Sequence, residues 1–304
     1  MPSSPSALAL LCIGHASYDQ IMCVDHHPDA DEKIVADQLL NCGGGPAANA
    51  AVMAAKLGFS AGFCGYLGND HFGNSHFAEL QANGINTQLI VRGTNPTPLS
   101  VVLVKPNGDR ALINHKGNTS PLSATSVNFA ALAPQVLLFD GHEPALSLAA
   151  LKQYSSRQID TVLDAGSVHE GTTNLLDRVN YLVCSEKFAC QYAGTPNQAL
   201  PKLAEKAPVV IITLGEQGLI WRRGLEQGQF PAPSIIAIDS TGAGDAFHGA
   251  FAAGLSAGLD WENLLAFASV AGALCCSGLG ARTSLPNKAQ HQELLKTWLA
   301  TLQA

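Results

Sequence analysis

The feature that most constrains the fold is a short glycine-rich stretch, residues 239–247, with the sequence D-S-T-G-A-G-D-A-F. An apolar run at 235–238 precedes it and predicts a short strand, and residues 246–257 predict a helix of small and apolar side chains. Gly242 and Gly244 carry no Cβ where the chain turns into that helix, so consecutive backbone N–H groups can face outward as an anion nest. The helix N-terminus adds about half a positive charge at the same point. The stretch therefore predicts a strand–turn–helix unit with an anion site.

One carboxylate, Asp245, lies within this positive field. A carboxylate at a helix start is often only a capping residue. The alternative is a general base beside an anion hole, which takes a proton from a hydroxyl group that attacks a phosphate. The residues alone leave both interpretations open.

The stretch resembles the signature of the ribokinase-like family of sugar kinases, whose usual form is D-T-x-G-A-G-D. A second signature of that family lies upstream, G-G-G-P-A-A-N-A-A at 43–51, followed by G-Y-L-G-N-D-H-F-G at 65–73. The similarity extends from about residue 11 to about residue 286, nearly the whole chain. It implies transfer of the γ-phosphoryl group of ATP to a hydroxymethyl group of a small sugar. The members with the most similar pattern are the ketohexokinase-like, sulfofructose kinase-like and fructokinase-like ones.

Composition limits the other classes of protein. Apolar residues make up 47% of the 304 residues and charged residues 13%, which suits a buried parallel sheet flanked by helices. The net charge of −7 provides no basic surface, so we expect no nucleic-acid partner. No apolar run approaches the roughly 20 residues of a membrane span, so we expect no membrane partner either. No basic residue precedes the short apolar run 7–13, which predicts a first strand rather than a signal peptide.

The eight cysteines show neither Cys-x-x-Cys nor Cys/His zinc spacing. Free, mostly buried thiols in a reducing compartment are the simpler interpretation, so we expect a cytoplasmic protein.

The apolar pattern predicts an open, doubly wound and mainly parallel α/β sheet flanked by helices, with a small inserted β-sheet lid. We expect residues 1–304 to form a single kinase unit. Its core takes about 1–14, 43–92 and 119–304, and its lid takes about 15–42 and 93–118. Core strands are expected at 8–14, 61–66, 87–91, 136–139, 161–163, 181–184 and 209–214. Ligands should bind at the carboxyl ends of the parallel strands, beneath the lid.

The lid should contain strands at 21–24, 33–40, 99–104 and 110–115. The Asn107-Gly108 step between the last two apolar runs predicts a hairpin. The C-terminal third is expected to be helical apart from 278–285.

The resemblance assigns catalytic roles to the glycine-rich stretch. Asp245 becomes the general base, and the N–H groups of Gly242, Ala243 and Gly244 hold the charge that develops on the transferred phosphoryl group. Asp19 follows a strand, where a carboxylate can accept two hydrogen bonds from a polyol, and the resemblance implies sugar binding there. A solvent-facing turn aspartate is the alternative.

Three residues of the upstream signature are also expected at the sugar. Gly43 and Gly44 allow the backbone to approach a ligand closely, and the Asn49 amide can both donate to and accept from adjacent hydroxyls. The alternative is a helix start in which Asn49 only packs.

The remaining motif positions concern the nucleotide and metals. Thr213, Gly215 and Gly218 resemble the T-x-G-x-x-G turn at the family's nucleotide site. Three further residues match positions that hold a monovalent cation, K⁺, in several members: Asp239, Thr241 and Gly280. The family's N-x-x-E pattern, linked to magnesium, is absent from the S-E-K-F at 185–188. Mg²⁺ is therefore expected to arrive with ATP, and no protein ligand for it can be named.

The identity of the sugar depends on three positions. Lys33, Asn114 and His142 match, by order along the chain, a lysine, an asparagine and an arginine that hold a sulfonate in sulfofructose kinase-like members. Histidine in place of arginine lowers the positive charge and removes the bidentate fork, so we expect a neutral ketose or pentose. The pair His142 and Glu143 leaves open which side chain reaches the sugar.

Three alternatives stay open: a sulfofructose kinase, a nucleoside kinase, and a non-catalytic sugar or nucleotide sensor. No obvious aromatic cluster in the lid favours stacking of a base, and the presence of Asp245 favours an enzyme. The exposed lid strands allow edge-to-edge pairing in a homodimer.

Overall fold

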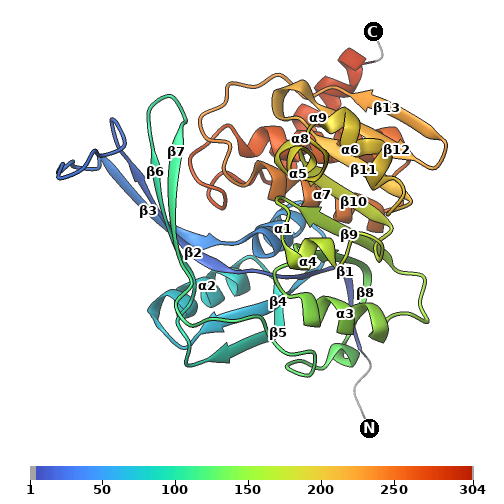
Figure 1. Cartoon of the computed structure of the whole chain (residues 1–304), viewed down its shortest axis with the longest axis horizontal. Coiled ribbons are helices and arrows are strands. Elements are labelled where there is room, and N and C mark those ends of the chain that lie inside the picture. Colours follow the sequence, from blue (N-terminus) through green and yellow to red (C-terminus); the bar gives the residue numbers. More distant parts are fainter. Residues whose placement is uncertain (1–4, 303–304) are drawn as a thin grey trace.

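The chain forms two separate β-sheets, with helices packed around the larger one (Figure 1). The computed structural model describes residues 5–302, so the ends of the expected core at 1–4 and 303–304 lie outside the described residues. The large sheet has nine strands in the spatial order β13 (Glu226–Phe230), β12 (Leu219–Arg223), β11 (Val209–Thr213), β10 (Tyr181–Ser185), β9 (Asp160–Ala165), β8 (Leu132–Phe139), β1 (Ser6–Ile13), β4 (Ala61–Gly68) and β5 (Asn86–Gly93). Neighbouring strands are parallel except at β11–β12 and β12–β13, which confirms the mainly parallel sheet.

Strand β1 shows why the central strands read as continuous apolar runs. Leu10 and Cys12 belong to the apolar cluster on one face of the sheet, and Leu11 and Ile13 belong to the cluster on the other. Successive side chains of a strand point to opposite faces, so a strand covered by helices on both sides must be apolar throughout. Strand β1 also lies between β4 and β8. The strand order reverses here, so the carboxyl ends of these strands form the expected ligand crevice.

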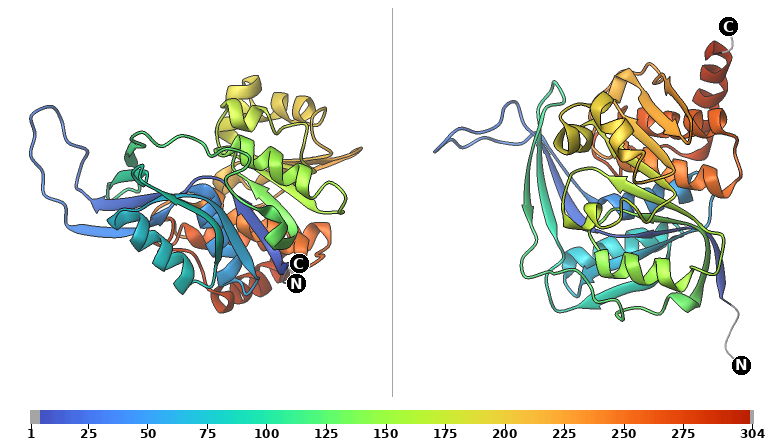
Figure 2. Two further views of the ribbon diagram at one scale, coloured as in Figure 1. Left: turned by 90° about the horizontal axis from the view of Figure 1, so that it is seen from below. Right: turned by 45° about the vertical axis from the view of Figure 1, so that its right-hand side comes forward.

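Helices cover both faces of the large sheet (Figures 1 and 2). One face carries α1 (Pro46–Lys56), α2 (His71–Ala82), α7 (Ala243–Ser256) and α8 (Trp261–Cys275). The other carries α3 (Pro144–Gln153), α5 (Glu186–Ala193) and α6 (Pro196–Leu203). Trp298 of α9 (Lys288–Leu302) packs on Ala266 and Val270 of α8. The connections contain α4 (Glu170–Thr173) and two 3₁₀ turns, η1 (Phe129–Ala131) and η2 (Gly215–Gln217).

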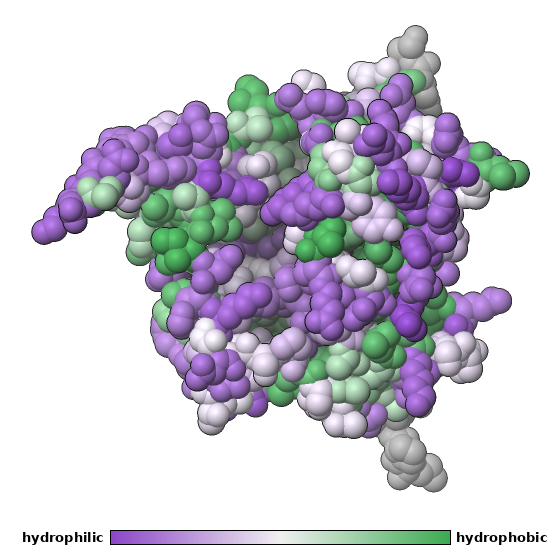
Figure 3. Space-filling model, in the orientation of Figure 1, coloured by the Kyte–Doolittle hydropathy of each residue, from purple (hydrophilic) through white to green (hydrophobic). Residues whose placement is uncertain are grey.

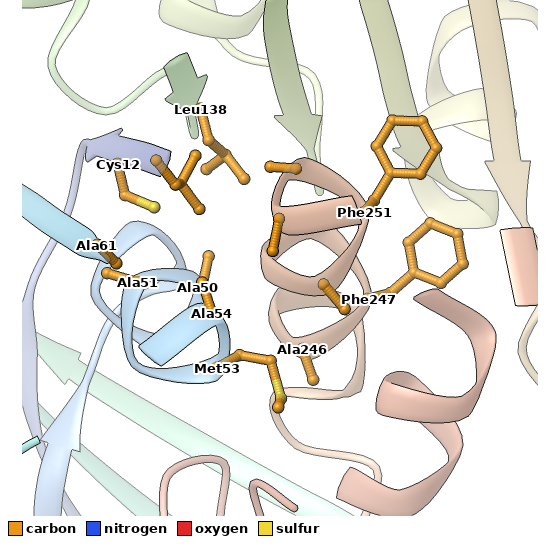
Figure 4. Close-up of a cluster of buried hydrophobic side chains, with 14 of the residues drawn as sticks. Cys12, Ala50, Ala51, Met53, Ala54, Ala61, Leu138, Ala246, Phe247 and Phe251 are labelled. Atoms are coloured by element: carbon orange, nitrogen blue, oxygen red, sulfur yellow. The ribbon is translucent and has the colours of Figure 1, made fainter. Parts of the chain in front are cut away.

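Helices α1 and α7 lie side by side with small residues between them, among them Ala50, Ala54 and Ala246 (Figure 4). Gly249 makes this close approach possible: a Cβ at that position would lie 2.4 Å from the carbonyl oxygen of Ala50. A side chain there would force the two helices apart. Because both helices begin at the crevice, their contact brings Asn49 of α1 near Asp245 of α7.

The small sheet, which we call the lid, has the order β3 (Gln38–Gly44), β2 (Ser17–Cys23), β6 (Leu99–Val104) and β7 (Arg110–His115). It projects from one side of the body (Figures 1 and 2). Ile21, Cys42, Val102 and Val104 form its apolar cluster, against which Leu279 of the body packs. On the opposite face, Leu39 and Ile113 are 53% and 65% exposed. The lid therefore has one face against the body and one apolar face without a cover.

Three sequence expectations are wrong. The expected strand at 33–40 begins only at Gln38 and continues to Gly44, because its register is set by pairing with β2. The run 235–238 is irregular and Ile236 is 89% exposed, since no strand within residues 5–302 pairs with it. The antiparallel hairpin β12–β13, with Gly224 at its turn, lies in the third expected to be helical.

None of the helices within residues 5–302 has the length and apolar character needed to cross a membrane.

Candidate active site

Asp245 lies in the first turn of α7 and is partly buried. The Asn49 side-chain amide donates a hydrogen bond of 2.7 Å to its Oδ2 atom. The pKa of Asp245 is raised above the ordinary aspartate value, mainly by burial and further by the charges of Asp140 and Asp19, while the Asn49 hydrogen bond and Arg282 act in the opposite direction. A carboxylate with a raised pKa accepts a proton from a hydroxyl group more readily.

The turn before Asp245 requires glycine at position 242. Gly242 has φ 78° and ψ 0°, a left-handed conformation, and a Cβ there would lie 2.5 Å from the Cβ of Ala281. The Ala243 N–H makes a long bond, 3.3 Å, to the Ser240 carbonyl oxygen. Within residues 5–302 the N–H groups of Gly242 and Gly244 have no acceptor. These first-turn donors and the helix dipole provide the chemistry of an anion hole.

A buried chain of hydrogen bonds supports Asn49, and sequence reasoning missed it. Arg282, only 3% exposed, donates from Nε to Asn49 Oδ1 at 3.0 Å and from Nη1 to Glu79 Oε1 at 3.0 Å. The Gly43 N–H donates to the other Glu79 oxygen at 2.6 Å. Because Arg282 engages the Asn49 oxygen, the Asn49 NH₂ group must face Asp245. A lone arginine in a loop has no periodic pattern that would have revealed this role.

A cavity of about 280 Å³ lies between the lid and the body, lined among others by Asp19, Asn49, Asn114, Lys116, His142 and Asp245. Asp19 is 7% exposed, and Ser17 Oγ donates to its Oδ1 at 2.8 Å. Burial is the main cause of the raised pKa of Asp19.

Gly43 and Gly44 do not line the cavity. A Cβ at Gly44 would lie 2.1 Å from Asp19 Oδ2, so this glycine makes room for the carboxylate.

Asp140, at the carboxyl end of β8, organises the loops under the cavity. Its carboxylate accepts the N–H groups of His15 at 2.7 Å, His142 at 2.9 Å and Ala47 at 3.2 Å. The ring of His142 lies between those of His15 and His169, with centroid distances of 5.2 and 4.8 Å. Burial lowers the pKa of His15 to about 4, so its ring is neutral at pH 7.

Of the pair expected near the sugar, His142 lines the cavity. Glu143 instead accepts the Leu122 N–H at 2.6 Å. Lys33 is exposed in the segment between β2 and β3 and is not among the residues that line the cavity.

A second cavity, of about 730 Å³, contains all three residues expected at the nucleotide. Thr213, Gly215 and Gly218 line it on one side, and Ser240, Ala243, Gly244, Phe247 and Cys276 line it on the other. Thr241 and Asp245 line the first cavity. The two cavities therefore border the same segment, 240–245, which contains the expected anion hole.

The three residues expected at a monovalent cation also come together. Asp239 Oδ1 accepts the Thr241 N–H at 2.9 Å and the Thr241 hydroxyl at 2.6 Å, and Oδ2 accepts the Gly280 N–H at 2.8 Å. Arg110 of the lid, another residue that sequence reasoning missed, lies 3.7 Å from Asp239 Oδ1.

No magnesium ligand can be assigned from the protein side. In the S-E-K-F segment Ser185 caps α5, and Glu186 is exposed. The described part of the chain contains no cluster of three or more His, Cys, Asp or Glu residues that could hold a metal ion.

Comparisons with known proteins agree with this geometry. Residues 8–288 match the family model described as pfkB family carbohydrate kinase. The chain is 29% identical over 289 residues to a ribokinase of Bacillus subtilis, covering 93% of this chain and 98% of that one. It is 27% identical over 310 residues to a probable fructokinase-5 of Arabidopsis thaliana, covering 91% and 95%. The structure of Arabidopsis thaliana ribokinase complexed with ribose and ATP superimposes with a TM-score of 0.81 at 25% identity, covering 95% and 99%.

Proposed function

Because the chain belongs to the pfkB family of carbohydrate kinases, it is a sugar kinase, and we propose that it transfers the γ-phosphoryl group of ATP to a hydroxymethyl group of a neutral ketose or pentose. One observation carries the proposal: the two cavities meet at residues 240–245, with Asp245 on one side and the nucleotide residues on the other. A sugar in the first cavity and the γ-phosphate of a nucleotide in the second would approach each other at this junction.

Asp245 is the general base in this mechanism. It takes the proton of the sugar hydroxyl as the hydroxyl oxygen forms its bond to the γ-phosphorus, and the bond to the bridging oxygen of ADP breaks. The N–H groups at Gly242, Ala243 and Gly244 face the charge that develops on the transferred group. Mg²⁺ would arrive with ATP and would neutralise part of the phosphate charge. Asn49 and Arg282 keep the base oriented throughout.

The lid provides one wall of the sugar cavity through Asp19 on β2 and Asn114 on β7. Asp19 accepts hydrogen bonds from sugar hydroxyls, and the Asn114 amide donates and accepts. Closure of the lid over the sugar excludes water, which would otherwise compete as an acceptor for the γ-phosphoryl group.

A neutral substrate agrees with the charges of the cavity. Lys116 is the one lysine or arginine that lines it within the described chain, and it is balanced by the carboxylates Asp19 and Asp245. His15 is neutral at pH 7 because burial lowers its pKa to about 4. An anionic substituent would find little net positive charge here.

The test is release of ADP with fructose, ribose, sulfofructose and adenosine as acceptors. We expect fructose or ribose to have the highest kcat/KM, and we expect Asp245→Asn to lose about 10²–10⁴ in turnover. A tenfold preference for sulfofructose or adenosine would contradict the neutral-sugar proposal. Binding of sugar and ATP without turnover on any acceptor would favour a sensor instead.

We also propose that the chain forms a homodimer through the lid and works in the cytoplasm. Figure 3 shows an apolar area on the lid, and Leu39 and Ile113 are exposed on its uncovered face. All eight cysteines are free, as expected of a reducing compartment. The molar mass in solution, measured by light scattering for the wild type and for Ile113→Glu, tests the dimer. A monomeric wild type would contradict it.

A further inference from the structure

Asp239 holds together two loops at the base of the anion hole. Its carboxylate, only 1% exposed, accepts two hydrogen bonds from Thr241 and one from Gly280. A buried carboxylate needs charge compensation as well as hydrogen bonds. In the described part of the chain its one ion-pair partner is Arg110, which comes from the lid rather than from the body.

Arg110 reaches this carboxylate by two routes. Its Nη1 atom lies 3.7 Å from Asp239 Oδ1, and it donates hydrogen bonds to Thr241 Oγ1 at 2.8 Å and Ser240 Oγ at 3.2 Å. The Thr241 hydroxyl in turn donates to Asp239 Oδ1. The guanidinium charge is therefore coupled to the carboxylate both through space and through a shared hydroxyl group.

The residues at this place do not fit a bound monovalent cation while Arg110 occupies its position. Both Asp239 oxygens already accept N–H or O–H donors, so positive ends of dipoles point where a cation would need oxygens. The carbonyl oxygens of Leu279 and Gly280 accept the hydroxyls of Thr283 and Ser284. A cation beside a guanidinium group would also be repelled by it.

We propose that Arg110 supplies, from the lid, the positive charge that a monovalent cation supplies at this position in other members of the family, so that this enzyme does not need K⁺. The lid contacts both loops that Asp239 joins. A Cβ at Gly108, in the turn between β6 and β7, would lie 3.0 Å from the Ile238 carbonyl oxygen, and one at Gly280 would lie 2.5 Å from Cδ1 of Ile21. The charge is therefore in place when the lid is closed.

The positive charge of Arg110 matters because Asp239 lies at the start of the segment that forms the anion hole. An uncompensated carboxylate there would repel the phosphates that the anion hole binds. Arg110 neutralises this negative charge. It also holds Ser240 and Thr241, the two residues that precede the anion hole, by hydrogen bonds.

The experiment compares wild type, Arg110→Met and the control Arg178→Met in chloride salts of K⁺, Na⁺ and tetramethylammonium at equal ionic strength. Methionine keeps most of the apolar stem of arginine. Arg178 is an exposed arginine that pairs with Asp177, far along the chain from Asp239. Two quantities are measured: the thermal unfolding midpoint, which does not require a known substrate, and kcat/KM for the sugar with the highest activity.

We expect wild type and Arg178→Met to show the same midpoint and the same kcat/KM, within about twofold, in all three salts. Arg110→Met should lose about tenfold or more in kcat/KM in tetramethylammonium, as expected for loss of a charged hydrogen-bonding partner. K⁺ should raise its midpoint above that in tetramethylammonium and restore most of the lost activity, because the vacated position can then take a cation.

Three results would overturn the proposal. Saturable activation of the wild type by K⁺ would show that a cation is needed beside Arg110. An Arg110→Met variant as active as wild type in every salt would show that the charge is not needed. An Arg110→Met variant that is inactive in every salt, and whose thermal unfolding midpoint is the same in all three, would give Arg110 another role, such as contact with the phosphates. If no sugar is phosphorylated at all, the midpoints still decide whether K⁺ binds in place of Arg110.

Discussion

The body and the lid contribute to the same cavity in different ways. In the body, Asp245 is held by Asn49, Asn49 by Arg282 and Arg282 by Glu79, and the two middle residues, Asn49 and Arg282, are buried. In the lid, Asn114 lies on β7, an edge strand with most of its residues exposed. The proposed base is therefore positioned by contacts within the body, whereas the contribution of the lid depends on how firmly the lid is held. We expect body substitutions to reduce kcat and lid substitutions to raise KM.

The largest effect is expected for Asp245→Asn, which removes the proposed base and keeps the size of the side chain. The kcat value should fall by about 10²–10⁴, the usual contribution of a general base. Dissociation constants for ATP and sugar, measured by calorimetry, should stay nearly unchanged. Turnover at the wild-type level would remove Asp245 from the mechanism.

The next effect is expected for Arg282→Met. Removal of this buried cation leaves Glu79 without its partner and frees the Asn49 amide, so unfolding in urea should show a loss of about 3 kcal/mol. The kcat value should fall more than KM rises, because the base loses its orientation. Arg178→Met, an exposed arginine substitution, is the control and should leave both quantities unchanged. A larger change in KM than in kcat would place Arg282 with the lid residues.

Asn49→Ala should shift the pH dependence of kcat/KM. The Asn49 hydrogen bond favours the charged form of Asp245 and so lowers its pKa. Without that bond the pKa rises further, and activity, which requires the ionised carboxylate, is lost at a higher pH on acidification. The acidic limb of the kcat/KM profile should therefore move to higher pH. An unmoved limb would mean that Asn49 does not act on the base.

The smallest effects are expected in the lid. Asn114→Ala removes a group that lines the sugar cavity, so KM for the sugar should rise about tenfold while kcat changes little. Lys33→Met is the matched control, because Lys33 is exposed between β2 and β3 and outside the lining of the cavity. It should leave kcat/KM within about twofold of wild type. A large loss in Lys33→Met would show that this segment reaches a sugar, for instance in a partner subunit.

The sequence allowed the order of the elements and the local motifs to be predicted well. Strands β6 and β7 have the expected bounds, because alternating apolar residues around an Asn-Gly turn specify a hairpin locally. The expected anion hole and nucleotide turn are likewise local motifs. Ala243 and Gly244 of the first line the same cavity as Thr213, Gly215 and Gly218 of the second.

Long-range polar contacts could not be predicted in this way. Arg282 meets Asn49 across 233 positions, and Arg110 meets Thr241 across 131. A single charged residue in a loop or on an exposed strand has no periodicity, so its partner becomes visible only when the fold is known. The prediction of a strand at 235–238 was wrong for a related reason: apolar residues form a strand only where a neighbouring strand can pair with them.

The contacts of Arg110 also have a thermodynamic consequence. Its two hydrogen-bond acceptors belong to different cavities: Ser240 lines the cavity proposed for the nucleotide, and Thr241 lines the cavity proposed for the sugar. We therefore expect this one lid residue to link the two proposed sites, so that a ligand that holds the lid closed changes the free energy of binding at the other site. Such coupling is reciprocal, so the factor by which sugar tightens nucleotide binding must equal the factor by which nucleotide tightens sugar binding. Calorimetric titrations in both orders measure these factors, and in Arg110→Met both should approach one.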